Sequence, residues 1–185
     1  MELTEYPLLH TQDLMLAVLR SAADGPGTLA DGLARIRATL DLAGEAPPVA
    51  DEDILAHLDR ARFQLLKAGL VEAAGGDRYQ TTERGLAVLE EHPTGVDESV
   101  LMAFPEYRAH VERSPRAETG VPGRAETARR TPEYDEGYAA FREGRSLADN
   151  PYPWDQDRHL AWENGWSESR DAELRSADWR DAKSR

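Results

Sequence analysis

The large apolar side chains of this 185-residue chain fall in two blocks, and residues 112–131 between them contain only one, Val121. A stretch with so little to bury cannot join a packed core, and its Pro, Gly and scattered charges are typical of a flexible linker. Each flanking block is long enough for a small domain. The sequence therefore predicts a domain over residues 1–111, a linker over 112–131 and a second module over 132–185.

Three segments with helical periodicity open the first block. They cover about residues 11–24, 28–46 and 51–68, with caps at Thr11 and Thr28 and a stop at Gly69. Residues 70–74 and 78–81 then flank Gly75-Gly76-Asp77, which predicts a short β-hairpin, and Thr82 caps a fourth helix. This order of elements is that of a winged helix-turn-helix domain, so we expect a mainly α fold with a small β-hairpin.

Four segments of this block, taken in order, resemble the N-terminal domain of Mrr-type restriction endonucleases over about residues 6–110. The segments are Met15–Leu19 with Ala23–Gly25, Arg62–Val71, Tyr79–Gly85 and Pro93–Tyr107. Enzymes of that family cut DNA with a separate nuclease domain that uses acidic residues and a lysine to hold a metal ion. The sole match to such a motif here is Asp181-Ala182-Lys183, with no strand to hold it. We therefore expect a DNA-binding domain without the nuclease.

One face of the third predicted helix carries polar and basic side chains and no acidic one. Together with the hairpin turn it gives five candidate nucleic-acid contacts, His57, Arg60, Gln64, Lys67 and Arg78. In a helix-turn-helix this face enters the major groove, where Arg and Lys pair with guanine and Gln pairs with adenine. Any surface helix has a polar face, however, so a protein-docking role for the same surface remains open.

The second block predicts a helical hairpin with an aromatic core. Tyr134, Tyr138 and Phe141 follow one another at helical spacing up to Gly144, and residues 150–153 form a rigid turn. A second helix begins near residues 155–157 and carries Trp162 and Trp166 around Gly165, a residue small enough to allow close helix packing. We expect a helical module of about 45 residues, which is marginal in size for independent stability.

The spacing of glycines and aromatic residues in this module resembles the ribosome modulation factor family over residues 132–173. The matching positions are Tyr134, Gly137, Tyr138, Ala140, Gly144 to Ser146, Asn150 to Tyr152, Trp162, Gly165 and Trp166. The resemblance implies a small helical protein that binds the ribosome near the end of the small-subunit RNA and favours inactive ribosome dimers. Residues 131–185 nevertheless hold 8 basic and 13 acidic residues, a balance that opposes RNA binding. The candidate RNA or partner contacts are Arg142, Arg145, Tyr152, Trp154 and Arg158, with Tyr152 and Trp154 expected as exposed rings.

Composition narrows the function classes further. The chain has no cysteine, which excludes disulfides and thiolate chemistry and favours a reducing cytoplasm. No segment approaches the length of a membrane span, and the acidic first thirty residues do not fit a signal peptide, so we expect neither export nor membrane insertion. The five histidines lie far apart and no phosphate-binding or serine-nucleophile motif occurs, so we expect no catalytic residue, cofactor or metal. The net charge of −13 requires any nucleic-acid contact to be local.

These observations leave three functional hypotheses open. The first is a non-catalytic DNA-binding protein with a regulatory, defence or phage accessory role, whose C-terminal module contacts a second target. The second is a ribosome- or RNA-associated factor whose winged helix docks on protein, and the third is an assembly protein that binds only other proteins. A homodimer formed through residues 100–111 is a further expectation.

Overall fold

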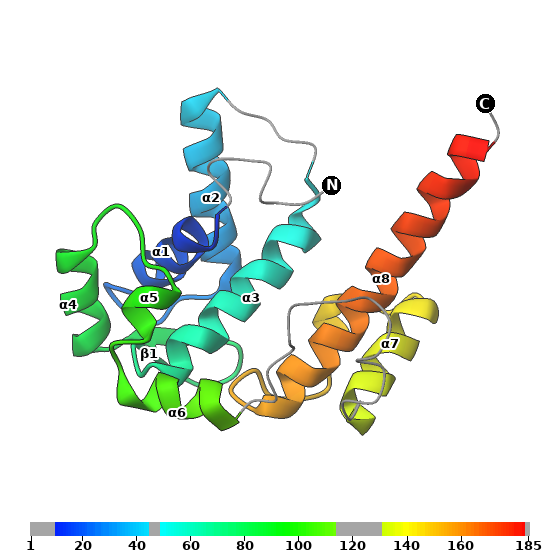
Figure 1. Cartoon of the computed structure of the whole chain (residues 1–185). Coiled ribbons are helices and arrows are strands. Elements are labelled where there is room, and N and C mark those ends of the chain that lie inside the picture. The colour runs from blue at the N-terminus through cyan, green and yellow to red at the C-terminus, as the bar shows by residue number, and fades with distance from the viewer. Residues whose placement is uncertain (1–9, 45–48, 114–130, 184–185) are drawn as a thin grey trace. The chain divides into compact units, whose positions relative to one another are not determined.

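The computed structural model of the chain describes residues 10–44, 49–113 and 131–183. It confirms a mainly helical fold with a single small antiparallel hairpin in the described residues (Figure 1). The chain divides into two compact units, residues 1–117 and 118–185, and each is described by itself below. The linker predicted over residues 112–131 lies almost entirely outside the described residues.

The N-terminal unit contains the predicted succession of three helices, two strands and a helix. Its elements are α1 (Thr11–Ser21), α2 (Leu29–Ala43), α3 (Asp51–Lys67), β1 (Val71–Ala73), β2 (Tyr79–Thr81), α4 (Glu83–Glu91), α5 (Glu98–Leu101) and α6 (Pro105–Arg113). The short helices α5 and α6 follow α4, and α6 packs against α3. The order expected for a winged helix is thus present, although order alone does not distinguish that fold from other small helical domains.

Local rules explain where most of these helices start and stop. Thr28 and Asp31 form a capping box at α2, in which the Asp31 carboxylate accepts from the Thr28 amide at 2.8 Å. Gly69 follows α3 with a positive φ of 71°, as expected of a glycine that ends a helix. The expectation for Thr11 was wrong, because Thr11 is the first residue of α1 and the cap position falls on His10, which makes no side-chain capping bond.

The core of the N-terminal unit lies where α1 packs against α2 and α3. Its largest fully buried side chains are Met15, Leu19, Leu40, Ile54, Leu58, Leu65, Leu70, Tyr79 and Leu101. Tyr79 joins the hairpin to this core, because its ring is buried and its hydroxyl lies 2.7 Å from the Ser21 hydroxyl. Thr81 adds a second link by donating to the Leu19 carbonyl at 2.8 Å. The hairpin is therefore fixed to α1 by its inner face.

The C-terminal unit is a helical hairpin, as the sequence predicted. Helix α7 (Pro132–Arg142) packs along α8 (Asp157–Lys183), and a 3-10 turn, η2 (Leu147–Asp149), lies in the connection between them (Figure 1). Its buried cluster consists of Ala140, Trp162 and Trp166. The Phe141 ring meets the Trp166 ring edge to face, with 5.1 Å between their centroids.

Two glycines set the distance between α7 and α8. A Cβ atom on Gly137 would lie 1.9 Å from the Trp162 carbonyl oxygen, and one on Gly165 would lie 1.9 Å from the Tyr134 carbonyl oxygen. Neither distance is compatible with any side chain larger than hydrogen. The close packing that the sequence predicted at Gly165 is confirmed, and Gly137 provides the reciprocal contact.

Within the described residues, no helix combines the length and the apolar character required to cross a membrane.

Candidate functional site

The connection between α7 and α8 is held against the first turns of α8 by a set of hydrogen bonds. The Asn150 side chain donates to the His159 carbonyl at 3.1 Å and accepts from the Tyr152 amide at 3.1 Å. The His159 ring donates from Nδ1 to the Tyr152 carbonyl at 2.8 Å, since a carbonyl oxygen can only accept. These bonds fix the backbone on both sides of Tyr152.

The Tyr152 ring carries an arginine on one face. Its hydroxyl donates to the Glu136 carboxylate at 2.7 Å, and this bond raises the pKa of Tyr152 above its ordinary value. The Arg158 guanidinium lies over the ring, 5.1 Å from its centroid, and also donates to the Gln156 side chain at 2.9 Å. Because Arg158 is exposed, the outer face of this stack is open to solvent.

Two further predicted cations lie at the end of α7. Arg142, in its last turn, and Arg145, just beyond it, are both exposed. The Arg145 side chain pairs with Glu143 at 2.8 Å, while its carbonyl accepts from the Trp166 indole at 2.8 Å. The backbone of Arg145 is thus anchored to the buried cluster and its side chain remains at the surface.

The expectation for Trp154 was wrong. We expected an exposed ring that could stack on a base, but only 4% of the Trp154 surface is accessible. Tyr152 is half-buried, and its ring is already in contact with Arg158. Of the two predicted rings, neither is therefore a bare stacking surface, and a base that approached Tyr152 from its Arg158 side would meet the guanidinium.

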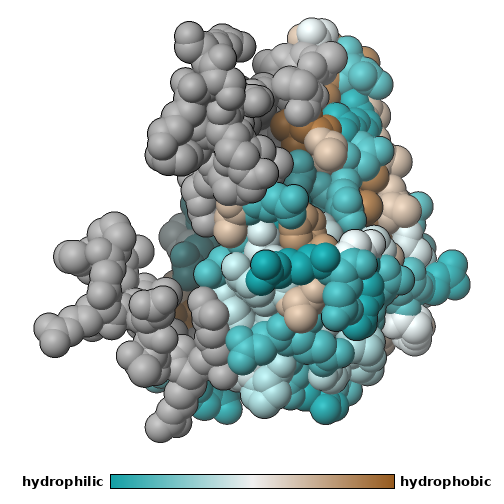
Figure 2. Space-filling view, turned by 90° about the vertical axis from the view of Figure 1, so that its right-hand side faces the viewer, coloured by the Kyte–Doolittle hydropathy of each residue, from teal (hydrophilic) through white to brown (hydrophobic). Residues whose placement is uncertain are grey.

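Among the described side chains of the C-terminal unit, no large hydrophobic residue is exposed. The exposed large hydrophobic residues within the described ranges are Leu42, Leu86 and Met102, all of them in the N-terminal unit. Among the coloured residues of the face shown in Figure 2, which draws the whole chain, hydrophilic residues predominate. A partner that contacts this described part of the hairpin would therefore meet charges and hydrogen-bonding groups rather than an apolar patch.

The predicted stripe on α3 is less accessible than expected. His57, Arg60, Gln64 and Lys67 are all half-buried, whereas Arg78 is exposed at the hairpin turn. Gln64 lies 3.5 Å from the Tyr107 hydroxyl of α6, and the Lys67 ammonium lies 4.6 Å from the centroid of the Phe63 ring. Part of the face that a recognition helix would present to DNA is therefore in contact with α6. DNA contact by these five residues stays a prediction.

A buried ion pair on α3 was missed in the sequence. Asp59 and Arg62 pair within the helix, and both side chains are almost completely buried. Arg62 also donates to the Asp77 carbonyl at 3.0 Å and lies over the Tyr79 ring at 5.6 Å. These contacts tie α3 to the hairpin. The spacing of three between the two residues was the available signal, but such pairs are common on exposed helix faces as well.

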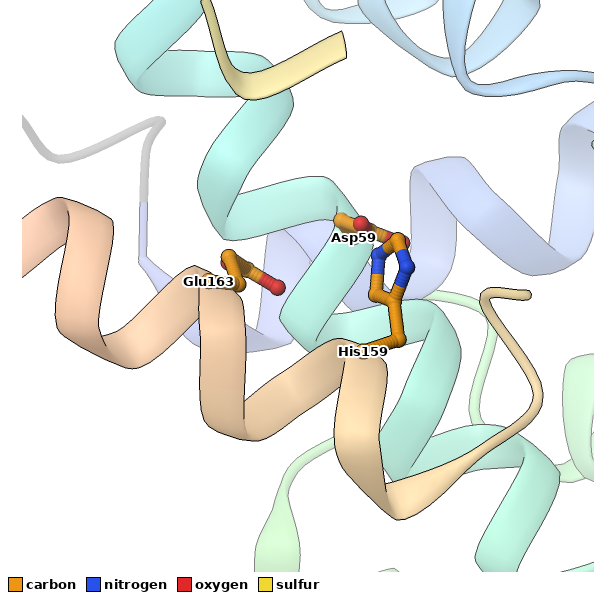
Figure 3. Close-up of side chains that lie close together, drawn as sticks. All are labelled: Asp59, His159 and Glu163. Carbon is orange, nitrogen blue, oxygen red and sulfur yellow. The ribbon is translucent and has the colours of Figure 1, made fainter. Parts of the chain in front are cut away.

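His159 and Glu163 lie on successive turns of α8, at the spacing of four that places two side chains on one face of a helix (Figure 3). Two such residues offer two ligand atoms, fewer than the three protein ligands of a typical catalytic zinc site. Asp59, also drawn in Figure 3, belongs to the N-terminal unit, where it pairs with Arg62.

Comparison with known proteins gives one finding for the C-terminal unit. A family model described as ribosome modulation factor matches residues 123–176, which include α7, the connection and most of α8. No curated protein and no solved structure matches the chain. The resemblance that the glycine and aromatic spacing suggested is thus confirmed for this unit. The resemblance of residues 6–110 to Mrr-type enzymes and DNA binding by that unit find no support in these comparisons.

Proposed function

We propose that this chain is a non-catalytic, ribosome-associated factor whose C-terminal hairpin contacts ribosomal RNA. The observation that carries the proposal is the match of residues 123–176 to the ribosome modulation factor family. The match coincides with the unit that holds Arg142, Arg145 and the Tyr152–Arg158 stack. This reading favours the second of the three functional hypotheses over direct DNA recognition.

The exposed arginines of the hairpin suit contact with RNA. Guanidinium groups form paired hydrogen bonds with phosphate oxygens, as Arg142 and Arg145 could do from the end of α7. A guanidinium plane is also a surface on which an unpaired base can stack, and the Arg158 guanidinium lies over the Tyr152 ring. The hydrogen bonds around Asn150 fix this stack before binding, which reduces the entropy lost when RNA arrives.

The acidic residues of the unit weaken this interaction without preventing it. The ion pair between Arg145 and Glu143 is solvent-exposed on both sides, so replacing Glu143 by a phosphate would cost at most about 1 kcal/mol. Residues 131–185 still carry an acidic excess. We therefore expect ribosome affinity to depend strongly on salt and to arise from a few phosphate contacts rather than from a broad basic face.

Co-sedimentation with purified ribosomes tests the proposal. Replacing Arg142, Arg145 and Arg158 by alanine should weaken binding by about tenfold or more. It should also reduce the slope of log affinity against log salt by about 1.4, since Arg142 and Arg145 would each contact one phosphate and each phosphate contact on single-stranded RNA contributes about 0.7.

The matched control replaces three exposed arginines of the N-terminal unit, Arg35, Arg108 and Arg113, and so makes the same change in net charge. This variant should bind ribosomes nearly as well as the wild-type chain. If both triple variants lose affinity equally, the hairpin is not the contact surface. If neither loses affinity, the proposal is wrong, and a partner protein that survives nuclease treatment in a pull-down would favour the assembly hypothesis.

DNA binding by α3 has its own test. In a gel-shift titration with duplex DNA, the double replacement of Arg60 and Lys67 by alanine should abolish any shift that the wild-type chain produces. Duplex binding that is unchanged by this replacement would remove the hypothesis.

A further inference from the structure

A hollow of about 700 Å³ lies on the N-terminal unit, between the outer face of the β-hairpin and the start of α4. The side chains that matter for its chemistry are those of Glu72, Gln80, Glu83, Arg84 and Leu86. All belong to one compact unit and all lie in the described part of the chain. None of its lining residues belongs to the C-terminal hairpin or to the polar stripe of α3.

The hairpin provides one wall of the hollow. Glu72 and Gln80 are direct partners in the antiparallel register, so their side chains lie next to each other on the same face. Their neighbours in the strands, Val71, Tyr79 and Thr81, are buried on the opposite face. Glu72 and Gln80 therefore project away from the core and into the hollow.

Helix α4 provides the other wall. Glu83 and Leu86 are three residues apart, a spacing that places both on one side of the helix. Leu86 is 38% exposed and is one of the few large hydrophobic residues of the described chain that reach solvent. An apolar side chain thus lies in the hollow with a carboxylate one turn away.

The charge of the hollow is negative at its edges. Glu72 and Glu83 are exposed, and neither takes part in an ion pair among the residues that the structure describes. The one cation in the lining, Arg84, is 46% exposed, pairs with Glu106 at 3.3 Å and lies over the Phe104 ring at 5.4 Å. Two carboxylates without an ion-pair partner in the described chain therefore line the hollow together with a partly exposed leucine, and its arginine already pairs with a third carboxylate, that of Glu106.

We propose that this hollow is a docking site for a basic protein segment in which Lys or Arg side chains flank an apolar residue. The basic groups would pair with Glu72 and Glu83, and the apolar residue would cover Leu86. A phosphate backbone does not suit the hollow, because both carboxylates would repel it. The N-terminal unit would thereby bind a protein, independently of any RNA contact made by the hairpin.

Fluorescence anisotropy with a defined peptide tests this site. The probe is a fluorescein-labelled peptide of sequence Lys-Ala-Lys-Leu-Lys-Ala-Lys, and the comparison peptide has Gly in place of Leu. The full chain should bind the leucine peptide saturably, with a dissociation constant below about 1 mM, and bind the glycine peptide at least about threefold more weakly. Equal affinity for both peptides would show that the leucine is not recognised and would overturn the proposal, as would the absence of saturable binding.

Three variants then locate the binding. The pair Glu72→Gln and Glu83→Gln, and separately Leu86→Ser, should each weaken the leucine peptide by about fivefold. The control pair Glu90→Gln and Glu91→Gln removes the same two charges from the far end of α4, where both side chains are exposed, and should change affinity by less than about twofold. Equal loss in both Glu pairs would indicate general attraction to an acidic protein and would overturn the assignment. An unchanged far-UV circular dichroism spectrum shows that each variant is folded.

Discussion

Replacing Gly137 by alanine is the most direct perturbation of the C-terminal hairpin. The added methyl group would lie 1.9 Å from the Trp162 carbonyl oxygen, whereas ordinary contacts begin near 3.4 Å. The two helices would have to separate locally by about 1.5 Å, the difference between these two distances. The obstacle is a backbone atom inside α8, so no side-chain rotation can relieve it.

The expected cost follows from two opposing effects. Overpacking of a well-packed contact costs about 1–3 kcal/mol, and the upper end applies here because the backbone must move. Alanine regains about 1 kcal/mol over glycine in helix propensity. The net loss of unfolding free energy is therefore about 2 kcal/mol. A core of this size supplies only about 3–5 kcal/mol, so the single variant should lose roughly half of its stability and the double variant with Gly165→Ala should not fold.

Tryptophan fluorescence during thermal unfolding measures this effect selectively, because all four tryptophans of the chain lie between residues 154 and 179. We expect the midpoint of the fluorescence transition to fall by roughly 10 °C or more in Gly137→Ala. Gly32→Ala in α2 is the control, since its new methyl group would make an ordinary contact 3.6 Å from Leu58; its unfolding is followed by circular dichroism, because the N-terminal unit has no tryptophan, and should show no comparable loss. A Gly137→Ala midpoint equal to or above that of the wild type would refute the reasoning, because propensity would then outweigh the contact.

Three further predictions concern the N-terminal unit, each measured by circular dichroism during denaturation. Thr28→Ala removes the capping box and should lower the unfolding free energy by about 1 kcal/mol, and Thr28→Ser should restore most of it. Burial, followed by the nearby Glu98 carboxylate, raises the pKa of Tyr107 to about 12, so the neutral phenol is favoured in the folded state. The stability that this provides is complete below pH 10, where an unfolded tyrosine stays protonated, and is lost between pH 10 and about pH 12. Tyr107→Phe should flatten the plot of unfolding free energy against pH over this range. A plot that is unchanged in this variant would contradict the assignment. Arg62→Ala leaves the Asp59 carboxylate buried without its partner and should lower the unfolding free energy by about 3 kcal/mol. The double variant Asp59→Asn with Arg62→Met should lose less. Equal losses of unfolding free energy in the single and the double variant would argue against the ion pair as the cause.

Features that depend on neighbouring residues in the sequence were predictable. The capping box at Thr28, the glycine that ends α3 and the Gly75-Gly76 turn of the hairpin each follow from a residue type at a fixed position. The aromatic and glycine spacing of the second block likewise predicted the helical hairpin, because that spacing fixes which side chains meet between two helices. These are local rules, and the fold obeys them at these positions, although not at Thr11, which is the first residue of α1 rather than its cap.

Features that depend on tertiary contacts were not predictable. A helical wheel places Gln64 on the polar face of α3, but it contains no information on α6, whose Tyr107 hydroxyl lies next to the Gln64 side chain. The stack of Arg158 on Tyr152 depends on the path of a connection that Asn150 folds back onto α8. The ring of Trp154 is buried for the same reason, since exposure is a property of the folded chain rather than of the residue type.

The paired glycines of the hairpin also constrain how this unit can diverge. Each one faces a backbone carbonyl that every amino acid possesses, so no substitution elsewhere in the hairpin can make room for a side chain at either position. Core residues can usually vary together through compensating substitutions, but no such substitution can accommodate a side chain at Gly137 or Gly165. Descendants of this sequence should keep both glycines or abandon this helix packing altogether, while the exposed arginines around them remain free to change with the partner.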